Sequence, residues 1–417
     1  MSLIGSGTLA MVIALALSAV ICTVACWEKL AALGVARWAV RGLMVFGCQL
    51  TAVLVVAVSV NDVFVFYSSW GELLGQHRPA TRYAARSGSM DSVLGPKLAA
   101  NYRAGRGTVV ALAVPAADSG VLADPATVYL PPQYGDPAYS RRSFPVVELL
   151  SGFPGGPQSW LRVSHISHVL DHLISTGESV PFIAVIPVQN VVSPRDTECV
   201  NVTRGPQVDT YLTIDVHRAT VDAFRASSSP WGVLGVSTGG YCAANLAFRH
   251  PDLFGAAVSI AGYNAAAHDA TTGSLFGGSR ALADANNLIW QLQHHRAPAL
   301  DLLVVSIRSD RASYRAGEQL ARAHRPPLEL WTLALPRGAH NFATFNAVLP
   351  TCFGWLSRLV PAPLTAIPSV DGVSPALHRQ DPRANHDLPA PLAHDARRTS
   401  PRQPCGRQQT TATRRCP

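Results

Sequence analysis

The chain has 417 residues, of which 48% are hydrophobic and 14% are charged, and this composition excludes an intrinsically disordered chain. The formal net charge is +8, but residues 362–417 contribute eight arginines against four aspartates, which is half of the excess. The remaining chain is too weakly basic to predict a nucleic-acid-binding protein.

Two apolar stretches lie near the N-terminus. The first 27 residues carry no charged side chain, and residues 42–61 are uncharged and mostly aliphatic. Twenty helical residues span roughly 30 Å, the thickness of the hydrocarbon layer of a membrane. We therefore predict membrane helices over residues 1–27 and 42–66. A cleaved signal peptide is the alternative for the first stretch, which lacks the basic start typical of such peptides.

The charge between the two stretches predicts their orientation. Residues 28–41 hold three basic side chains and one acidic side chain, whereas the N-terminal flank has no basic side chain. By the positive-inside rule, this loop is cytoplasmic and the chain after residue 66 lies outside. Arg78 and Arg82, which follow the second stretch, reduce the asymmetry.

Residues 67–106 show no clear periodicity and are predicted as a linker, and a domain of α/β type follows over residues 107–360. Early strands at hairpin-like spacing, then strands alternating with helices, indicate a sheet that is mostly parallel in its later part. The predicted strands are Val109–Val114, Thr127–Leu130, Val146–Leu150, Phe182–Ile186, Gly232–Val236, Ala256–Ile260, Leu302–Ile307 and Leu328–Leu335, and the predicted helices are Val163–Ile174, Tyr211–Ala226, Tyr241–His250 and Phe342–Leu359.

The C-terminal segment, residues 361–417, differs in composition from the rest. After Pro361 it contains nine prolines and eight arginines but no aromatic residue. Such a segment cannot bury enough apolar surface to fold, so we predict a disordered tail.

The strongest motif lies in WGVLGVSTGGY, where Gly235, Ser237 and Gly239 have the G-x-S-x-G spacing. An apolar run precedes the serine, and a predicted helix follows it. This is the pattern of a strand that delivers a nucleophilic serine onto a sharp turn, where small neighbours let the backbone pass closely. Ser237 is the candidate nucleophile.

A serine hydroxyl needs a base to take its proton and a carboxylate to orient that base. Asp310 follows the strand that ends at residue 307, and His340 lies in the loop before the last helix. Both therefore lie at the carboxyl ends of strands, where catalytic groups collect. Glu318 is the rival of Asp310. The competing histidines at positions 250, 294, 295 and 324 are predicted to be surface residues.

Acyl transfer also needs N–H donors for the developing oxyanion. The N–H of Thr238, next to the nucleophile, is one candidate. The second is the N–H of Phe153 in the glycine-rich turn LSGFPGG, with Gly152 as the runner-up, because Pro154 has no N–H. A plain loop is the alternative function of this turn.

At these residues the chain resembles the bacterial "putative esterase" family of α/β-hydrolases, which includes esterase D, feruloyl esterases and the antigen 85 mycolyltransferases. The resemblance rests on three segments, LLSGFPGG at 149–156, GVSTGGYCAANLAFRHPDLFGAAVSIAGY at 235–263 and RGAHNFATFNAVLP at 337–350. It covers residues 107–360, and with the two apolar stretches the chain is similar to membrane-anchored actinobacterial members. The resemblance implies an α/β-hydrolase fold, Ser237 as nucleophile and His340 as base.

The branches of the family differ at the acid and at the sugar site. The esterase D and feruloyl branches imply Asp310 as the acid, whereas the mycolyltransferase branch carries a glutamate on the next helix, which matches Glu318. That branch has Asp and Arg beside its oxyanion turn for sugar binding, where this chain has Ser151 and Pro154. The departure argues against trehalose as the acceptor.

The eight cysteines have no CxxC spacing and no zinc-type cluster, so we predict no structural metal and no cofactor. If the domain lies outside the cytoplasm, Cys199 and Cys242 could form a disulfide that ties a loop to the nucleophile helix. Two separate core thiols are the alternative.

The sequence thus predicts a membrane-anchored serine hydrolase that cleaves carboxylic esters, with a cell-envelope lipid as a candidate substrate. The first alternative is an acyltransferase to a sugar or lipid hydroxyl. The second is a hydrolase fold that has lost catalysis and serves as a binding protein.

Overall fold

The computed structural model describes residues 6–29, 36–64, 90–192, 195–228, 230–360, 364–365 and 396–398. Its helices are α1 Ser6–Cys26, α2 Ala36–Phe64, α4 Met90–Arg103, α5 Ile166–Ser175, α6 Val208–Thr210, α7 Val216–Ala223, α8 Thr238–Arg249, α9 Arg280–Ala285, α10 Leu288–His294, α11 Arg311–Ala323 and α12 Phe342–Ser357. Shorter helical turns are η2 Pro132–Gly135, η3 Pro137–Tyr139, η4 Ser159–Val163 and η5 Tyr211–Asp215. Its strands are β1 Thr108–Leu112, β2 Ala126–Leu130, β3 Arg142–Ser143, β4 Val146–Leu150, β5 Ile183–Ile186, β6 Trp231–Val236, β7 Phe254–Ile260, β8 Asp301–Ile307, β9 Glu329–Leu335, β10 Leu364–Thr365 and β11 Ala396–Arg398.

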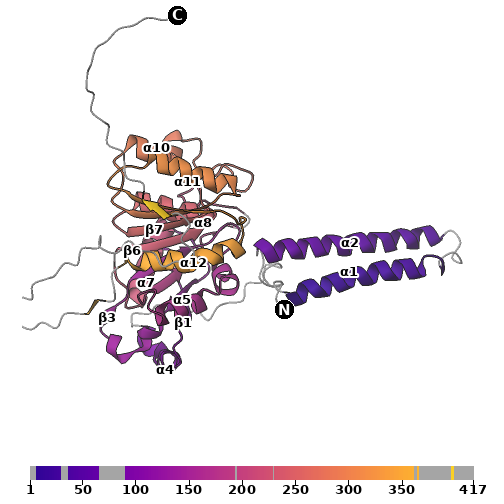
Figure 1. Cartoon of the computed structure of the whole chain (residues 1–417), viewed down its shortest axis with the longest axis horizontal. Helices are drawn as coiled ribbons and strands as arrows, with labels where there is room; N and C mark the ends of the chain where they lie inside the picture. The colour runs from indigo at the N-terminus through magenta and orange to yellow at the C-terminus, as the bar shows by residue number, and fades with distance from the viewer. Residues whose placement is uncertain are drawn as a thin grey trace, which may run out of the picture.

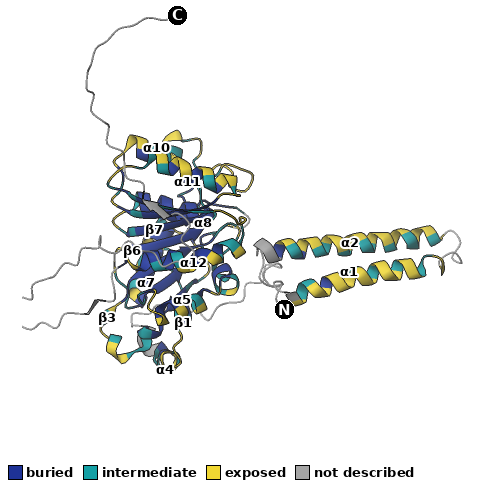
Figure 2. Ribbon diagram, viewed as in Figure 1, coloured by how far each residue is buried: buried dark blue, intermediate teal, exposed yellow. Residues whose placement is uncertain are grey.

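The helices α1 and α2 lie side by side as a pair with exposed apolar side chains (Figure 2). Both are long and apolar enough to cross a membrane, over Gly7–Cys26 and Ala36–Asn61. The second helix begins at Ala36, six positions earlier than the predicted membrane helix 42–66, so the prediction of a loop up to residue 41 is wrong at its end. Arginine is a good helix former, so a charged residue need not end a helix.

The predicted linker contains a helix. Residues 90–103 form α4, and the side chains of Leu94 and Leu98 are buried in the core of the α/β domain. The prediction of a linker over 67–106 is therefore wrong for this part. The glycine and proline at positions 95 and 96 disfavour a helix, but burial of two leucines four residues apart places both on one face against the sheet.

A sheet of nine strands runs through the domain in the order β1-β2-β5-β4-β6-β7-β8-β9-β11 (Figure 1). The strands from β5 to β9 are parallel to one another, and β1, β2 and β11 are antiparallel to their neighbours. All eight predicted strands are present, and the later part of the sheet is parallel as predicted. Parallel strands end at one edge, which brings the segments after β4, β5, β6, β8 and β9 together.

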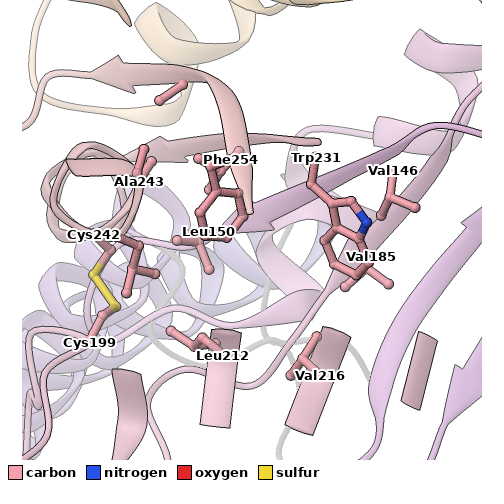
Figure 3. Packing of buried hydrophobic residues seen from close by; sticks show 14 of the residues in the cluster. Val146, Leu150, Val185, Cys199, Leu212, Val216, Trp231, Cys242, Ala243 and Phe254 are labelled. Carbon is pink, nitrogen blue, oxygen red and sulfur yellow. A yellow bond between two sulfur atoms is a disulfide. The ribbon is translucent and has the colours of Figure 1, made fainter. Parts of the chain in front are cut away.

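Helices cover both faces of the sheet, whose central strands β4, β5 and β6 are buried along their whole length (Figures 1 and 2). On one face α5 and α12 pack against Val147 and Leu149 of β4. On the other face, buried side chains of α4, α7, α8, α10 and α11 belong to one core cluster together with Val146 and Leu150. Alternate residues of one strand thus serve two cores, as a strand buried on both sides requires. Figure 3 shows the second of these cores around Trp231 and Phe254.

The tail predicted as disordered lies mostly outside the described residues. Two short strands within it are described. Residues 364–365 pair with β3, and residues 396–398 pair with the edge strand β9. An edge strand leaves N–H and C=O groups open, and these can accept a further strand.

Candidate active site

Ser237 lies at the sharp turn between β6 and α8. Its φ of 56° and ψ of −124° fall outside the ordinary regions, and its N–H donates to the carbonyl oxygen of Ile260 over 2.8 Å. The flanking glycines are required by close contact. A Cβ on Gly235 would lie 1.9 Å from the carbonyl oxygen of Gly239, and a Cβ on Gly239 would lie 2.3 Å from that of Leu150. The turn therefore presents the serine hydroxyl at the carboxyl edge of the sheet.

The imidazole of His340 lies between the other two predicted residues. Its Nε2 is 2.8 Å from Oγ of Ser237, and its Nδ1 is 2.8 Å from Oδ2 of Asp310. The ring packs edge-on against Phe345 at 5.3 Å between centroids. Both distances of 2.8 Å are those of hydrogen bonds, so a chain of hydrogen bonds runs from the serine through the imidazole to the carboxylate.

The loop that carries His340 is held at both ends. Gly338 has a φ of 142°, and its carbonyl oxygen accepts a hydrogen bond from Ser309. The N–H of Ala339 donates to Oγ1 of Thr344 over 2.9 Å, and Asn341 caps the start of α12. The histidine is thus fixed to β8 on one side and to α12 on the other, while 43% of its side-chain surface stays exposed.

Asp310 is the N-cap of α11, where its Oδ1 accepts from the N–H of Ala312 over 3.2 Å. Burial raises the pKa of this carboxyl, but the hydrogen bonds from His340 and Ser313 outweigh burial, and the pKa falls below its usual value. The group is therefore ionised at neutral pH and able to stabilise a charged imidazole.

The rival acid, Glu318, pairs with an arginine and not with His340. Glu318 lies further along α11, with 43% of its side chain exposed, and pairs with Arg322 at 3.1 Å. His250 instead contacts Asp209, and His324 contacts the carbonyl oxygen of Leu328. Of the candidate acids, the structure brings Asp310 to His340.

The two predicted oxyanion segments flank the serine. A Cβ on Gly152 would lie 3.1 Å from Cβ of Ser237, so the turn after β4 runs against the nucleophile. Phe153 follows in this turn, and the peptide bond between Phe153 and Pro154 is cis. Thr238 is the first residue of α8, and the first N–H groups of a helix have no partner within it. The role of both N–H groups stays a prediction.

Several polar residues near these segments were not predicted. They come from the segments after β5 and after β7, and they are Gln189, Asn190, Asp196, Glu198 and Tyr263. Gln189 contacts both backbone groups of Ser151, and Asp196 accepts a hydrogen bond from the Thr238 hydroxyl. The position of Gln189 and Asn190, directly after a strand at the sheet edge, is the sequence signal that could have found them.

Cys199 and Cys242 are joined by a disulfide, with their Cα atoms 5.7 Å apart (Figure 3). Cys242 lies on α8, five positions after the serine, and both residues are buried. The bond ties the segment after β5 to the nucleophile helix. Within the described part of the chain, no group of three or more His, Cys, Asp or Glu side chains could hold a metal ion.

Comparisons with known proteins identify the family and the fold of the chain. The model of a family described as "Putative esterase" matches residues 125–346, more than half of the chain. An uncharacterized protein of Corynebacterium glutamicum is 25% identical over 252 residues, and the match spans 58% of each chain. The chain thus covers less than two thirds of this relative.

Two solved structures are similar. An S-formylglutathione hydrolase from Agrobacterium tumefaciens has a TM-score of 0.52 at 16% identity, covering 61% of this chain and 96% of its own. A ferulic acid esterase has a TM-score of 0.48 at 18% identity, covering 61% of this chain and 98% of its own. The first of these similarities indicates a shared fold.

Proposed function

This chain belongs to the "Putative esterase" family of α/β-hydrolases, as its motifs predict, and we propose that it is a serine hydrolase that cleaves carboxylic esters through an acyl-enzyme on Ser237. One observation carries the proposal. His340 makes hydrogen bonds of 2.8 Å to both Ser237 and Asp310. An imidazole placed in this way can take the hydroxyl proton while the carboxylate stabilises the resulting charge.

The reaction divides into two halves. Oγ of Ser237 attacks the ester carbonyl carbon while Nε2 of His340 takes the hydroxyl proton, and the oxyanion is held by the N–H groups of Thr238 and Phe153. The intermediate collapses when His340 gives its proton to the leaving alkoxide, which departs as the alcohol. The acyl group stays on the serine.

A second nucleophile then releases the acyl group. His340 takes a proton from water, the hydroxide adds to the acyl carbon, and the serine leaves with that proton as the carboxylic acid forms. A sugar or lipid hydroxyl in place of water would give a new ester instead. The same residues therefore serve an esterase or an acyltransferase.

We further propose that α1 and α2 anchor the enzyme in the membrane with the catalytic domain outside the cytoplasm. Arg37 and Arg41 lie in the first turns of α2, and Arg41 donates to the carbonyl oxygen of Trp27 at the end of α1, over 2.8 Å. Its guanidinium lies 4.6 Å from the Trp27 ring centroid. Arginine and tryptophan at one end of the pair are typical of a membrane interface, and the basic end favours the cytoplasmic side. The Cys199–Cys242 disulfide supports an oxidising compartment for the domain.

A fluorophosphonate probe tests the nucleophile. Wild-type protein is expected to be labelled and Ser237→Ala is not, because the probe reacts with an activated serine. Equal labelling of the two would contradict the proposal and leave a binding protein as the function. On intact cells, a membrane-impermeant version of the probe should label the wild-type serine if the domain is outside. Labelling that appears only after lysis would contradict the proposed orientation.

A panel of p-nitrophenyl esters of graded acyl length, with and without glycerol or trehalose, tests the acceptor. A rate unaffected by either alcohol would support the esterase. Formation of a glycerol or trehalose ester at the expense of free acid would favour the acyltransferase. A preference for long acyl chains would support a cell-envelope lipid as substrate.

A further inference from the structure

The segment after β5 contacts the turn that carries one predicted oxyanion donor. Gln189, 1% exposed, accepts from the N–H of Ser151 over 2.7 Å and donates to its carbonyl oxygen over 2.5 Å. Its neighbour Asn190 donates to the carbonyl oxygens of Gly152 and Gly155. A side-chain amide that satisfies both backbone groups of one residue fixes the position of the turn.

The same segment, further along, contacts the residue that carries the other donor. Oδ2 of Asp196 accepts from the hydroxyl of Thr238 over 3.2 Å. The hydroxyl of Tyr263 lies 2.7 and 2.6 Å from the two carboxyl oxygens of Glu198 and 3.2 Å from Oγ1 of Thr238. The side chain of Thr238 is therefore held by Asp196 and Tyr263, and Tyr263 is held by Glu198.

These contacts are enclosed in the protein. Asp196 is 3% exposed and Glu198 is 1% exposed. Oδ1 of Asp196 accepts from the N–H of Glu198 over 2.9 Å, and Cys199, the next residue, is bonded to Cys242 on α8. Tyr263 stacks on the buried Tyr241 at 5.0 Å between centroids. The segment with the two acids is thus connected to α8 at two points, by the Cys199–Cys242 disulfide and by the hydrogen bond between Asp196 and Thr238.

We propose, resting on the ester cleavage inferred above, that Asp196 and Glu198 are positioning residues of the oxyanion hole. Asp196 holds Thr238 directly, and Glu198 holds it through Tyr263 while Glu198 is protonated. Their hydrogen-bond network determines how firmly the first N–H of α8 is aimed at the reacting carbonyl.

A count of protons shows why one is needed. If Glu198 is protonated, it donates to Tyr263, the phenol donates to Thr238, and the threonine hydroxyl donates to Asp196, so each contact holds one hydrogen. If Glu198 is ionised, the phenol donates to Glu198 instead, and Thr238 loses that hydrogen bond.

The charges around the pair favour the protonated state at neutral pH. Burial, together with the nearby carboxylates of Asp196 and Asp269, raises the pKa of Glu198 to about 8, although hydrogen bonds from Tyr263 and the Ala267 N–H oppose this. Burial also raises the pKa of Asp196, and burial and Glu198 raise that of Tyr263, which stays a donor. The guanidinium of Arg195 is directed to carbonyl oxygens of Thr272 and Ser274.

The test is the pH dependence of kcat for full-length protein in detergent, with p-nitrophenyl butyrate. Wild-type kcat is expected to fall about tenfold between pH 7 and pH 9.5, as Glu198 ionises and one hydrogen bond to Thr238 is lost. In Glu198→Gln the amide donates to Tyr263 at every pH, so the alkaline fall should disappear. Tyr263→Phe should lower kcat at pH 7 and also remove the alkaline fall, with KM changed less than kcat.

Matched controls come from a second tyrosine and acid pair. Tyr129 donates to Asp171 over 2.7 Å, outside the candidate site. Asp171→Asn and Tyr129→Phe should keep the wild-type alkaline fall, since they remove a similar contact elsewhere. If Glu198→Gln does not fold, Tyr263→Phe still tests the network because it leaves both acids in place.

The outcomes separate the two proposals. Loss of the alkaline fall in Glu198→Gln or Tyr263→Phe, but not in the controls, supports the positioning role. A wild-type profile in either folded variant overturns it, with ester cleavage still supported by labelling of Ser237. If Ser237→Ala cleaves the ester as fast as wild type, the proposed function itself fails.

Discussion

At the scale of single residues, the site depends on how each polar group is held by a neighbour. His340 has one nitrogen on Ser237 and the other on Asp310, so the carboxylate decides which nitrogen carries the proton. Asp310 is in turn fixed as the N-cap of α11. The geometry favours Asp310 over Glu318, and a pair of variants tests that choice.

Asp310→Asn should lower kcat by about 10³- to 10⁴-fold, since an amide cannot stabilise the imidazolium and favours the wrong tautomer. Asparagine is also a good N-cap, so α11 should remain intact and the melting temperature should change little. The matched control is Glu318→Gln, whose side chain is exposed and pairs with Arg322. Steady-state kinetics with p-nitrophenyl butyrate measures kcat for both variants and shows which acid is required. Equal losses in both variants, or a loss in Glu318→Gln alone, would contradict the role of Asp310.

At the scale of elements, the sequence predicts best what local pattern determines. The run before Ser237, the glycines around it and the helix after it are adjacent in the chain, so strand, turn and helix are all visible in one motif. The strands are buried apolar runs, and each appears within a few residues of its predicted place. His340 and Asp310 were identified because they follow such strands.

Other elements depend on contacts that are distant in the chain. The helix α4 contains Gly95 and Pro96, and burial of two leucines against the sheet overrides their low helix propensity. The helix α11 is rich in charged residues and buries only a narrow stripe that includes Leu320. The network around Thr238 joins β7 to the segment after β5, a pairing that sequence spacing does not express.

The packing of α4 gives a prediction at this scale. Leu94→Ala should lower the stability of the domain by about 2–5 kcal/mol, because the side chain is 3% exposed and its removal leaves a cavity. Lys97→Ala, one turn away on the exposed side, should change it by less than about 0.5 kcal/mol. Thermal unfolding followed by near-UV circular dichroism measures both. If Leu94→Ala melts with wild type, α4 does not belong to the folded domain.

The disulfide gives a second prediction at the scale of elements. It joins residues 43 positions apart and connects the segment after β5 to α8. Replacing both cysteines, in Cys199→Ser/Cys242→Ser, should lower stability by about 2–5 kcal/mol, as expected for loss of a cross-link that restricts the unfolded chain. Cys22→Ser, at an exposed free cysteine of α1, is the control. Equal thermal unfolding of the double variant and the control would show that the bond carries little stability.

At the scale of the whole molecule, an apolar helix pair is combined with a domain whose reactive edge is rich in buried charge. The domain buries an acid pair beside Thr238 and a third acid, Glu148, within strand β4. A buried carboxyl with a raised pKa lowers the free energy of unfolding at any pH at which the same group would be ionised in the unfolded chain. The buried acids of the site therefore make the stability of the whole domain depend on pH.

The sign of that dependence follows from Glu198, whose pKa rises from 4.5 to about 8 on folding through burial. Between these values the folded chain keeps a proton that the unfolded chain has released, so stability falls as pH rises from about 5 to 8. Asp310, with a lowered pKa, loses its contribution only in more acidic solution. The melting temperature of wild type should therefore drop more between pH 5 and 8 than that of Glu198→Gln, whereas Asp171→Asn should follow wild type. If Glu198→Gln and wild type show the same slope, Glu198 does not hold its proton in the folded enzyme, and the alkaline fall in kcat needs another source.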